Sequence, residues 1–179
     1  MRRLNTFLVI GIILSFLFHA VSGSIRLFGA DAGYPKTAAM LCIALVVLHV
    51  VITAVLTAKT LKAMRKSGKG YFRENKLFWT RRISGAALLI PLVMHLLVFS
   101  GTGDEAYRLV LFNSGRLISQ ILLAAVLAFH ILTNIHPFLV GIGVKEHKII
   151  SADMLFVVSV FLLFCCGAFC VYYLRWMAY

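Results

Sequence analysis

Five long blocks of apolar residues constrain this chain more than any other feature of its sequence. They cover residues 4–23, 38–58, 83–101, 117–138 and 151–174. A run of roughly 18 or more mainly apolar residues can cross the hydrocarbon core of a bilayer as a helix. Since 61% of the 179 residues are hydrophobic and only 13% are charged, a water-soluble globule would lack a polar surface. The sequence therefore predicts an all-α integral membrane bundle of five transmembrane helices, forming a single domain over residues 1–179.

The first block has a second interpretation, as a secretory signal. It follows Met1-Arg2-Arg3 and ends in Ala20-Val21-Ser22-Gly23, and this basic start and small-residue end resemble a signal peptide with its cleavage site. We interpret the block as a retained helix, because the other four blocks work best with this one as a partner.

The charged residues lie mainly in the short connections between the blocks. The connection at residues 59–82 holds nine basic residues against a single acid, Glu74, and the N-terminus adds Arg2 and Arg3. Lysine and arginine concentrate in the cytoplasmic loops of membrane proteins. We therefore expect the helices to span a bacterial cytoplasmic membrane and to be surrounded by its lipid. The N-terminus and residues 59–82 are expected in the cytoplasm, and the C-terminus is expected outside. This placement accounts for the net charge of +12, which does not indicate a nucleic-acid partner.

Four of the six histidines lie well inside the apolar blocks, one in each of the first four: His19, His49, His95 and His130. Ionisable side chains within a membrane span are costly and usually functional, and neutral imidazole is a good ligand for iron. No Asp, Glu, Lys or Arg lies deep in a block to pair with them. Any one of these histidines could instead be a packing residue that hydrogen-bonds a neighbouring helix. Four of them, one per helix, point to metal ligation.

The depths of these histidines in the membrane define two levels. At a helical rise of about 1.5 Å per residue, His19 and His95 lie roughly 22 and 20 Å above the cytoplasmic edge. His49 and His130 lie roughly 14 and 12 Å above it. A haem iron with two axial histidines needs both imidazoles at one depth. The pattern predicts two haem b groups with bis-histidine ligation, which leaves no open iron position and suits electron transfer.

The remaining two histidines are expected at the membrane surface. His136 falls near the cytoplasmic edge of its block, and His147 falls in a connection. His136 is the alternative fourth ligand if His130 does not serve.

Small and basic residues around the histidines are candidates for holding the haem groups. Gly11 and Gly85 precede His19 and His95 by eight and ten residues, and a missing side chain lets a flat macrocycle, or equally a neighbouring helix, approach the backbone. Haem propionates need cationic or hydroxyl partners near the membrane surface. Candidate partners are Arg81, Arg82 and Ser84 for the inner haem, and Arg26 and Arg116 for the outer one. Arginines that only extend their charge to the interface would give the same pattern.

Several short motifs resemble the membrane cytochrome b subunit of succinate:quinone oxidoreductases, the succinate dehydrogenase and fumarate reductase group, in its single-chain, five-helix, di-haem form. Arg2-Arg3-Leu4, Gly11 and Phe16-Leu17-Phe18-His19 are similar to the first helix of that family. Arg81-Arg82-Ile83-Ser84-Gly85 followed by His95 resembles the entry to its third helix, and Ala128-Phe129-His130 resembles its fourth ligand. The resemblance covers the whole chain in layout.

The resemblance implies the same two ligand pairs, His19 with His95 at the outer haem and His49 with His130 at the inner haem. It also implies partners: an iron–sulfur subunit on the cytoplasmic face, a flavoprotein subunit that interconverts succinate and fumarate, and a membrane quinone such as menaquinone. The chain itself has no glycine-rich dinucleotide fingerprint and no cysteine set for an iron–sulfur cluster. We therefore expect an electron-transfer and quinone-reactive subunit that is not catalytic on the dicarboxylate by itself.

Three acidic residues are candidates for accepting the protons that quinol oxidation releases. Asp31, Asp104 and Glu105 are the carboxylates expected on the outer face, and they are candidate proton acceptors at a quinone site near the outer haem. Some members of the family carry a further carboxylate just before the fourth ligand, for proton movement across the membrane. Here that neighbourhood is Leu127-Ala128-Phe129, so this route is not expected.

Two other functions fit parts of the pattern. A cytochrome b subunit of a hydrogenase, formate dehydrogenase or nitrate reductase complex would keep the haem groups, although these types often place two histidines on one helix. A non-redox membrane protein, such as a small transporter or an assembly factor, would use the histidines for packing only. One histidine on each of four successive helices favours the succinate:quinone oxidoreductase type.

Overall fold

Five long helices make up most of the described chain. The computed structural model describes residues 2–30, 36–67, 75–99, 112–144 and 147–177. The helices are α1 (Arg2–Leu27), α2 (Lys36–Ser67), α4 (Lys76–Phe99), α5 (Ser114–Gly141) and α6 (His147–Met177), and these described residues contain no strand. Each helix is long and apolar enough to cross a membrane. The predicted all-α bundle of five transmembrane helices is confirmed, and the chain is a multi-pass membrane protein.

The helices are longer than the apolar blocks from which they were predicted. Four predicted spans lie wholly inside α1, α2, α5 and α6, whereas the last two residues of the span 83–101 fall outside the described residues. The 32 residues of α2 measure about 48 Å, against roughly 30 Å for the hydrocarbon core of a bilayer. Its last turn contains Arg65 and Lys66, so α2 continues as a basic helix beyond its apolar stretch.

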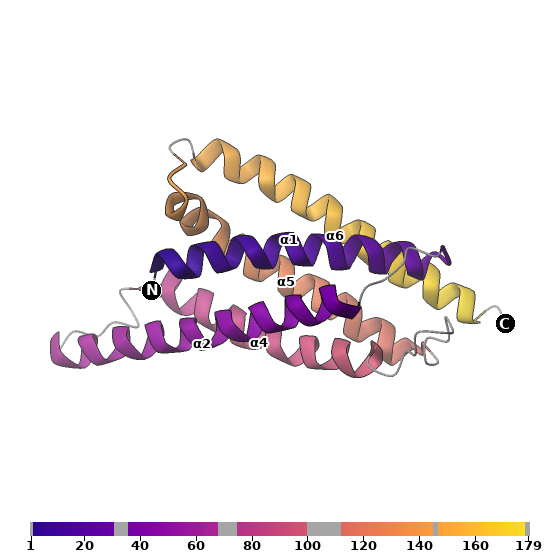
Figure 1. Ribbon diagram of the computed structural model, residues 1–179, viewed down its shortest axis with the longest axis horizontal. Helices are drawn as coiled ribbons and strands as arrows, with labels where there is room; N and C mark the ends of the chain where they lie inside the picture. The colour runs from indigo at the N-terminus through magenta and orange to yellow at the C-terminus, as the bar shows by residue number, and fades with distance from the viewer. Residues whose placement is uncertain (1, 31–35, 68–74, 100–111, 145–146, 178–179) are drawn as a thin grey trace.

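Successive helices run in opposite directions along the bundle, and the two chain termini lie at opposite ends (Figure 1). The N-terminus, the end of α2 and the start of α4 lie at one end, here called the N-terminal end of the bundle. The end of α1 and the end of α6 lie at the other, here called the C-terminal end. This up-and-down path places the two termini on opposite sides of a membrane. Which side is cytoplasmic stays a prediction from the basic residues.

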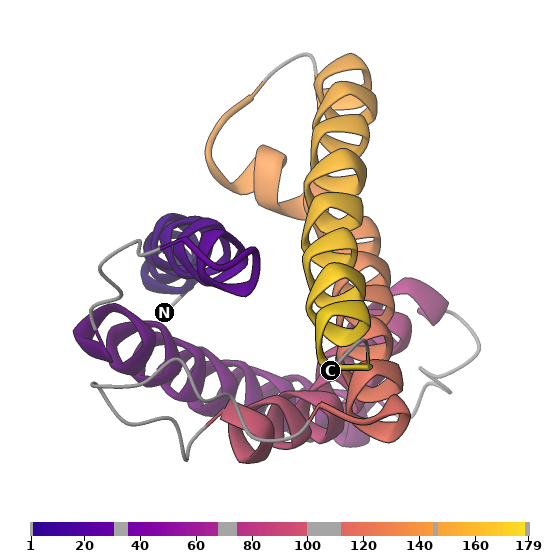
Figure 2. The ribbon, with the colours of Figure 1, turned by 90° about the vertical axis from the view of Figure 1, so that its right-hand side faces the viewer.

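The helices form an open ring. α1 packs against α2 and α6, and α5 packs against α4 and α6, whereas α2 and α4 do not pack closely on each other in the described part of the chain. The end-on view in Figure 2 shows α1 on one side and α5 with α6 on the other, while α2 and α4 overlap along the lower part of the view. At the α1–α2 contact, a Cβ added to Gly11 would lie 3.5 Å from Leu45 Cδ1, an ordinary packing distance.

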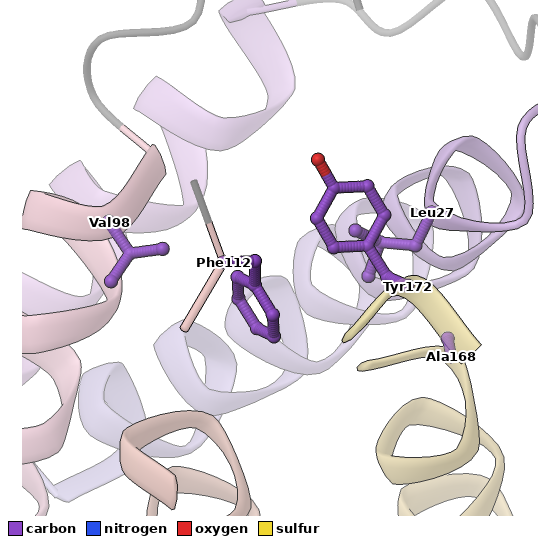
Figure 3. Close-up of a cluster of buried hydrophobic side chains, with 5 residues drawn as sticks. All are labelled: Leu27, Val98, Phe112, Ala168 and Tyr172. Carbon is purple, nitrogen blue, oxygen red and sulfur yellow. The ribbon is translucent and has the colours of Figure 1, made fainter. Parts of the chain in front are cut away.

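A cluster of buried apolar side chains ties three helices together at the C-terminal end of the bundle. Leu27 of α1, Val98 of α4, and Ala168 and Tyr172 of α6 surround Phe112, which precedes α5 and is 2% exposed (Figure 3). Large apolar side chains along all five helices remain exposed, from Leu4 to Met177. This is the pattern of a bundle surrounded by lipid, where apolar side chains face outward at no cost.

Candidate functional site

His19 of α1 and His95 of α4 lie side by side towards the C-terminal end of the bundle. Their ring centroids are 5.9 Å apart and their planes cross at 80°. The two helices do not pack closely on each other in the described residues, so the imidazoles reach towards one another across the interior of the ring. The structure thus brings together the two histidines that the depth estimate assigns to the outer level, while their role as ligands stays a prediction.

The imidazole of His95 is held by a buried glutamine of α5. Its Nδ1 is 2.7 Å from Oε1 of Gln120, a side chain with no exposed surface. On the C-terminal side, the ring of Phe99 lies one helical turn away, with 5.0 Å between the centroids. Phe99 in turn packs against the apolar cluster around Phe112. His95 is therefore fixed by a hydrogen bond on one side and by aromatic packing on the other.

His130 of α5 is seated against α4. Its Nδ1 is 3.0 Å from Oγ of Ser84 and 3.4 Å from Nδ2 of Asn134. A Cβ added to Gly85 would come within 3.2 Å of His130 Cε1, closer than most real contacts of that kind. The ring therefore occupies the space that a side chain at position 85 would need. Ser84 and Gly85 are both predicted from the sequence as haem-site residues, and the structure places Ser84 in contact with His130 and Gly85 beside its ring.

His49 of α2 lies near His130 and Arg82, within the range at which charges on these side chains would interact. The Nδ1 atom of His49 is buried and makes no hydrogen bond to any described residue. A buried polar atom normally has a partner, and an unsatisfied one is a reason to look for a ligand or a water at the site.

The two adjacent arginines of α4 have different surroundings. Arg81 Nε donates a hydrogen bond of 3.0 Å to the backbone carbonyl oxygen of Thr133. Pro137, inside α5, has no N–H group to satisfy that carbonyl four residues earlier, so Arg81 replaces the missing helical donor. Arg81 is thus engaged in joining α4 to α5 beside His130.

Arg82 is not engaged in this way. Its guanidinium lies over the ring of Phe78, 5.2 Å from the centroid, and its Nε is buried without a hydrogen-bond acceptor among the described residues. A buried cationic donor without an acceptor is favourably placed for an anion. Of the pair Arg81 and Arg82, the second therefore fits the predicted role at a propionate.

The other predicted site residues lie at a helix–helix contact, at helix ends or outside the described chain. Gly11 contacts α2 through Leu45, as a helix-packing glycine does. Arg26 and Arg116 lie in the last turn of α1 and the first turn of α5. The proposed quinone-site acids lie outside the described residues: Asp31, Asp104 and Glu105.

His136, the alternative fourth ligand, lies on α5 with an exposed side chain. It follows His130 by six residues, which turns it about 120° around the helix axis from His130. His130 faces Ser84 of α4, so His136 faces away from that contact. The arrangement favours His130 over His136 at the inner level.

Sequence reasoning missed Gln120, Thr133 and Asn134. Gln120 carries the signal that could have identified it, because a long amide side chain inside a membrane span needs a polar partner. The available partners on the other helices are few, and a histidine is among them. Thr133 and Asn134 carry a weaker signal, since serine, threonine and asparagine near a helix end often bond their own backbone, as both do here.

The fold and these side chains define a class: a five-helix membrane bundle with histidines between its helices, of which His19 and His95 lie side by side. In the described chain no three His, Cys, Asp or Glu side chains gather as a metal site would require. A haem iron needs only two ligands from the protein, the two axial side chains, because the porphyrin supplies the other four. No known protein family, curated protein or solved structure matches this chain.

Proposed function

We propose that this chain is a di-haem b-type membrane cytochrome. His19 and His95 would be the axial ligands of the outer haem, and His49 and His130 those of the inner haem. The observation that carries the proposal is the 5.9 Å between the ring centroids of His19 and His95, which come from helices that do not pack closely.

That spacing agrees with ligation of one metal by both rings. Two imidazoles on opposite sides of one metal ion, each with a metal–nitrogen distance of about 2 Å, have ring centroids about 6 Å apart. A hydrogen bond on the second ring nitrogen is also typical of metal-binding histidines. His95 makes such a contact with Gln120, and His130 makes one with Ser84.

Two groups at the inner level further support haem binding, namely a cationic side chain and a ring nitrogen without a hydrogen bond. Arg82 has a buried Nε without an acceptor among the described residues, and His49 has a buried Nδ1 in the same condition. Gly85 leaves room for the His130 ring. Haem b with two axial histidines supplies one-electron transfer and no open coordination position for oxygen. The chain's own residues would bind the two haem groups, orient them and exclude water from them.

We further propose that the chain is the membrane subunit of a complex like succinate dehydrogenase or fumarate reductase. The support is the sequence resemblance and the basic segment at residues 59–82, which would lie in the cytoplasm and serve as a docking surface for an iron–sulfur subunit and its flavoprotein. Electrons would pass between these subunits and a membrane quinone. The membrane is taken to be a bacterial cytoplasmic one, with the N-terminus inside.

Purified protein, expressed with haem available, should contain about two haem b per chain, low-spin in both redox states. The reason is that four histidines in two pairs satisfy both axial positions of two irons. A reduced-minus-oxidised spectrum with haem quantitation measures this directly. One haem per chain would contradict the two-level arrangement, high-spin iron would contradict bis-histidine ligation, and colourless protein would favour packing histidines.

Replacing Arg82 with Gln should lower the reduction potential of the inner haem and leave the outer one unchanged. A nearby positive charge favours the reduced form, whose net charge is lower, and Gln removes that charge while keeping a shorter polar side chain. We expect a shift of about 60 mV, equivalent to about tenfold in the equilibrium constant of a one-electron couple.

A redox titration followed in the visible spectrum measures both haems in one sample. Arg65→Gln is the matched control, since Arg65 is an exposed arginine in the last turn of α2. Equal shifts for the two variants would mean that Arg82 acts only through overall charge, and an unchanged inner potential would separate Arg82 from the haem.

A further inference from the structure

A chain of polar groups leads from His95 to the backbone of α5, in the middle of an apolar bundle. His95 Nδ1 lies 2.7 Å from Gln120 Oε1, and Gln120 Nε2 donates a 2.9 Å hydrogen bond to Ser119 Oγ. Ser119 Oγ donates a 2.7 Å bond to the carbonyl oxygen of Arg116. Gln120 and Ser119 are 0% and 3% exposed, so this part of the chain is buried inside the bundle.

The far end of this chain determines the direction of every bond in it. A carbonyl oxygen can only accept, so the single hydroxyl hydrogen of Ser119 is directed at Arg116. Ser119 Oγ must then accept from Gln120, which places the NH2 group of the amide at Ser119 and its oxygen at His95. An amide oxygen also only accepts. The hydrogen between Gln120 and His95 therefore lies on His95 Nδ1, and the lone pair of the neutral ring lies on Nε2.

We propose that Gln120 is a positioning residue that holds His95 in the Nδ1–H form, with Nε2 presented as a metal-binding nitrogen. The identity of the metal bound at Nε2 rests on the proposed function. The position of the hydrogen on the His95 ring does not depend on it. By accepting from Nδ1–H, Gln120 also increases the electron donation of Nε2, which stabilises the oxidised state of a bound iron.

The inner level has a related but shorter arrangement. Ser84 Oγ lies 3.0 Å from His130 Nδ1 and donates a 3.1 Å bond to the carbonyl oxygen of Arg81, which leaves this hydroxyl to accept from Nδ1–H of His130. The amide nitrogen of Asn134, 3.4 Å from the same ring nitrogen, can only donate, and it donates a 2.8 Å bond to the carbonyl oxygen of His130. The chain through a fully buried amide is the feature of His95 at the outer level.

The first test uses the full-length chain prepared without haem and labelled with ¹⁵N at histidine. NMR distinguishes the two neutral ring forms, because protonated and unprotonated ring nitrogens have well-separated shifts. His95, identified by its absence from a His95→Ala sample, should be in the Nδ1–H form by about tenfold or more over the other form. A predominant Nε2–H form would overturn the proposal, whether or not the protein binds haem.

The second test compares substitutions at Gln120 in the haem-loaded protein. Gln120→Leu removes the acceptor and should raise the reduction potential of the outer haem, by about tenfold in the ferric-to-ferrous equilibrium. Gln120→Glu keeps an acceptor at the same position, so the potential should equal that of the unchanged protein or fall below it. A purely structural role would move both variants in the same direction, and that result would overturn the proposal.

Two serine variants complete the design, and they cover the case in which Gln120→Leu fails to fold. Ser119→Ala leaves His95 and Gln120 intact but releases the amide, so the Nδ1–H preference of His95 should weaken. Ser159→Ala is the control, because Ser159 is exposed and its hydroxyl donates to the carbonyl of Leu155 in its own helix. Equal His95 spectra for Ser119→Ala and Ser159→Ala would contradict the one-way chain. Absence of haem from the unchanged protein would reject the proposed function and leave the NMR result standing.

Discussion

The variants His95→Ala and His19→Ala should each lose the outer haem completely, and the spectrum of the inner haem should stay largely intact in both. The two rings lie 5.9 Å apart, so they would share one iron, and loss of either leaves that iron five-coordinate in a loosened site. Replacing His49 or His130 should remove the inner haem in the same way. Haem quantitation and low-temperature spectra of the four single variants measure the pairing.

Packing histidines would behave differently. Interhelical hydrogen bonds in membrane proteins contribute about 0.6 kcal/mol on average, so each substitution would then give a small, graded loss of stability with no pairing. His136→Ala is the matched control, because His136 lies on α5 with an exposed side chain. Loss of the same haem in the His19 and His49 variants would show that the pairs are wrong. If His130→Ala kept both haems, His136 would replace His130 as the fourth ligand.

Replacing Gly85 with Val should weaken binding of the inner haem by about 10- to 100-fold and leave the outer haem in place. Even a Cβ at position 85 would lie 3.2 Å from Cε1 and 3.7 Å from Nδ1 of His130. The two further methyl carbons of Val must therefore displace the ring. Overpacking of this kind costs about 1–3 kcal/mol, and here it acts on a predicted ligand.

Gly167→Val is the matched control for this substitution. Gly167 lies in the interior of α6, and a Cβ added there would have no neighbour within 4 Å. Any cost of a β-branched residue in a transmembrane helix is therefore common to both variants. Haem content measured at increasing detergent or temperature compares them. Equal losses of haem would mean that Gly85 serves helix packing in general and has no special relation to His130.

The five helices follow from the sequence by itself. Each apolar block has only one stable arrangement in hydrocarbon, a helix whose backbone groups bond one another, so local composition determines where the spans lie. The ends of the helices were harder to predict from the sequence. α2 runs to Ser67, nine residues past its predicted end at residue 58, because lysine and arginine continue a helix into the interface as readily as they end one.

The histidines were also found in the sequence, because imidazole inside a span is conspicuous and its depth follows from counting residues. Counting along each helix assigns His19 and His95 to one level, and the structure places their rings beside each other. Depth is a one-dimensional quantity that a straight helix preserves. The direction in which each ring points around its helix is decided by packing, and the sequence did not supply it.

Tertiary structure alone separates residues that look alike in the sequence. Arg81 and Arg82 are adjacent, yet one satisfies a carbonyl left open by Pro137 and the other keeps a buried donor without an acceptor among the described residues. Gly11 and Gly85 both precede a histidine, yet the first contacts Leu45 of α2 and the second makes room for His130.

The physical reason is that these distinctions depend on which helices become neighbours. Gln120 and His95 are 25 residues apart in the chain, and nothing in either apolar block indicates that α4 and α5 meet at that height. Burial of an apolar helix is non-directional, whereas a hydrogen bond requires two named atoms at one distance. The sequence therefore determined the helices and the depth of their histidines, and the packing of α4 on α5 decided which polar groups hold His95 and His130.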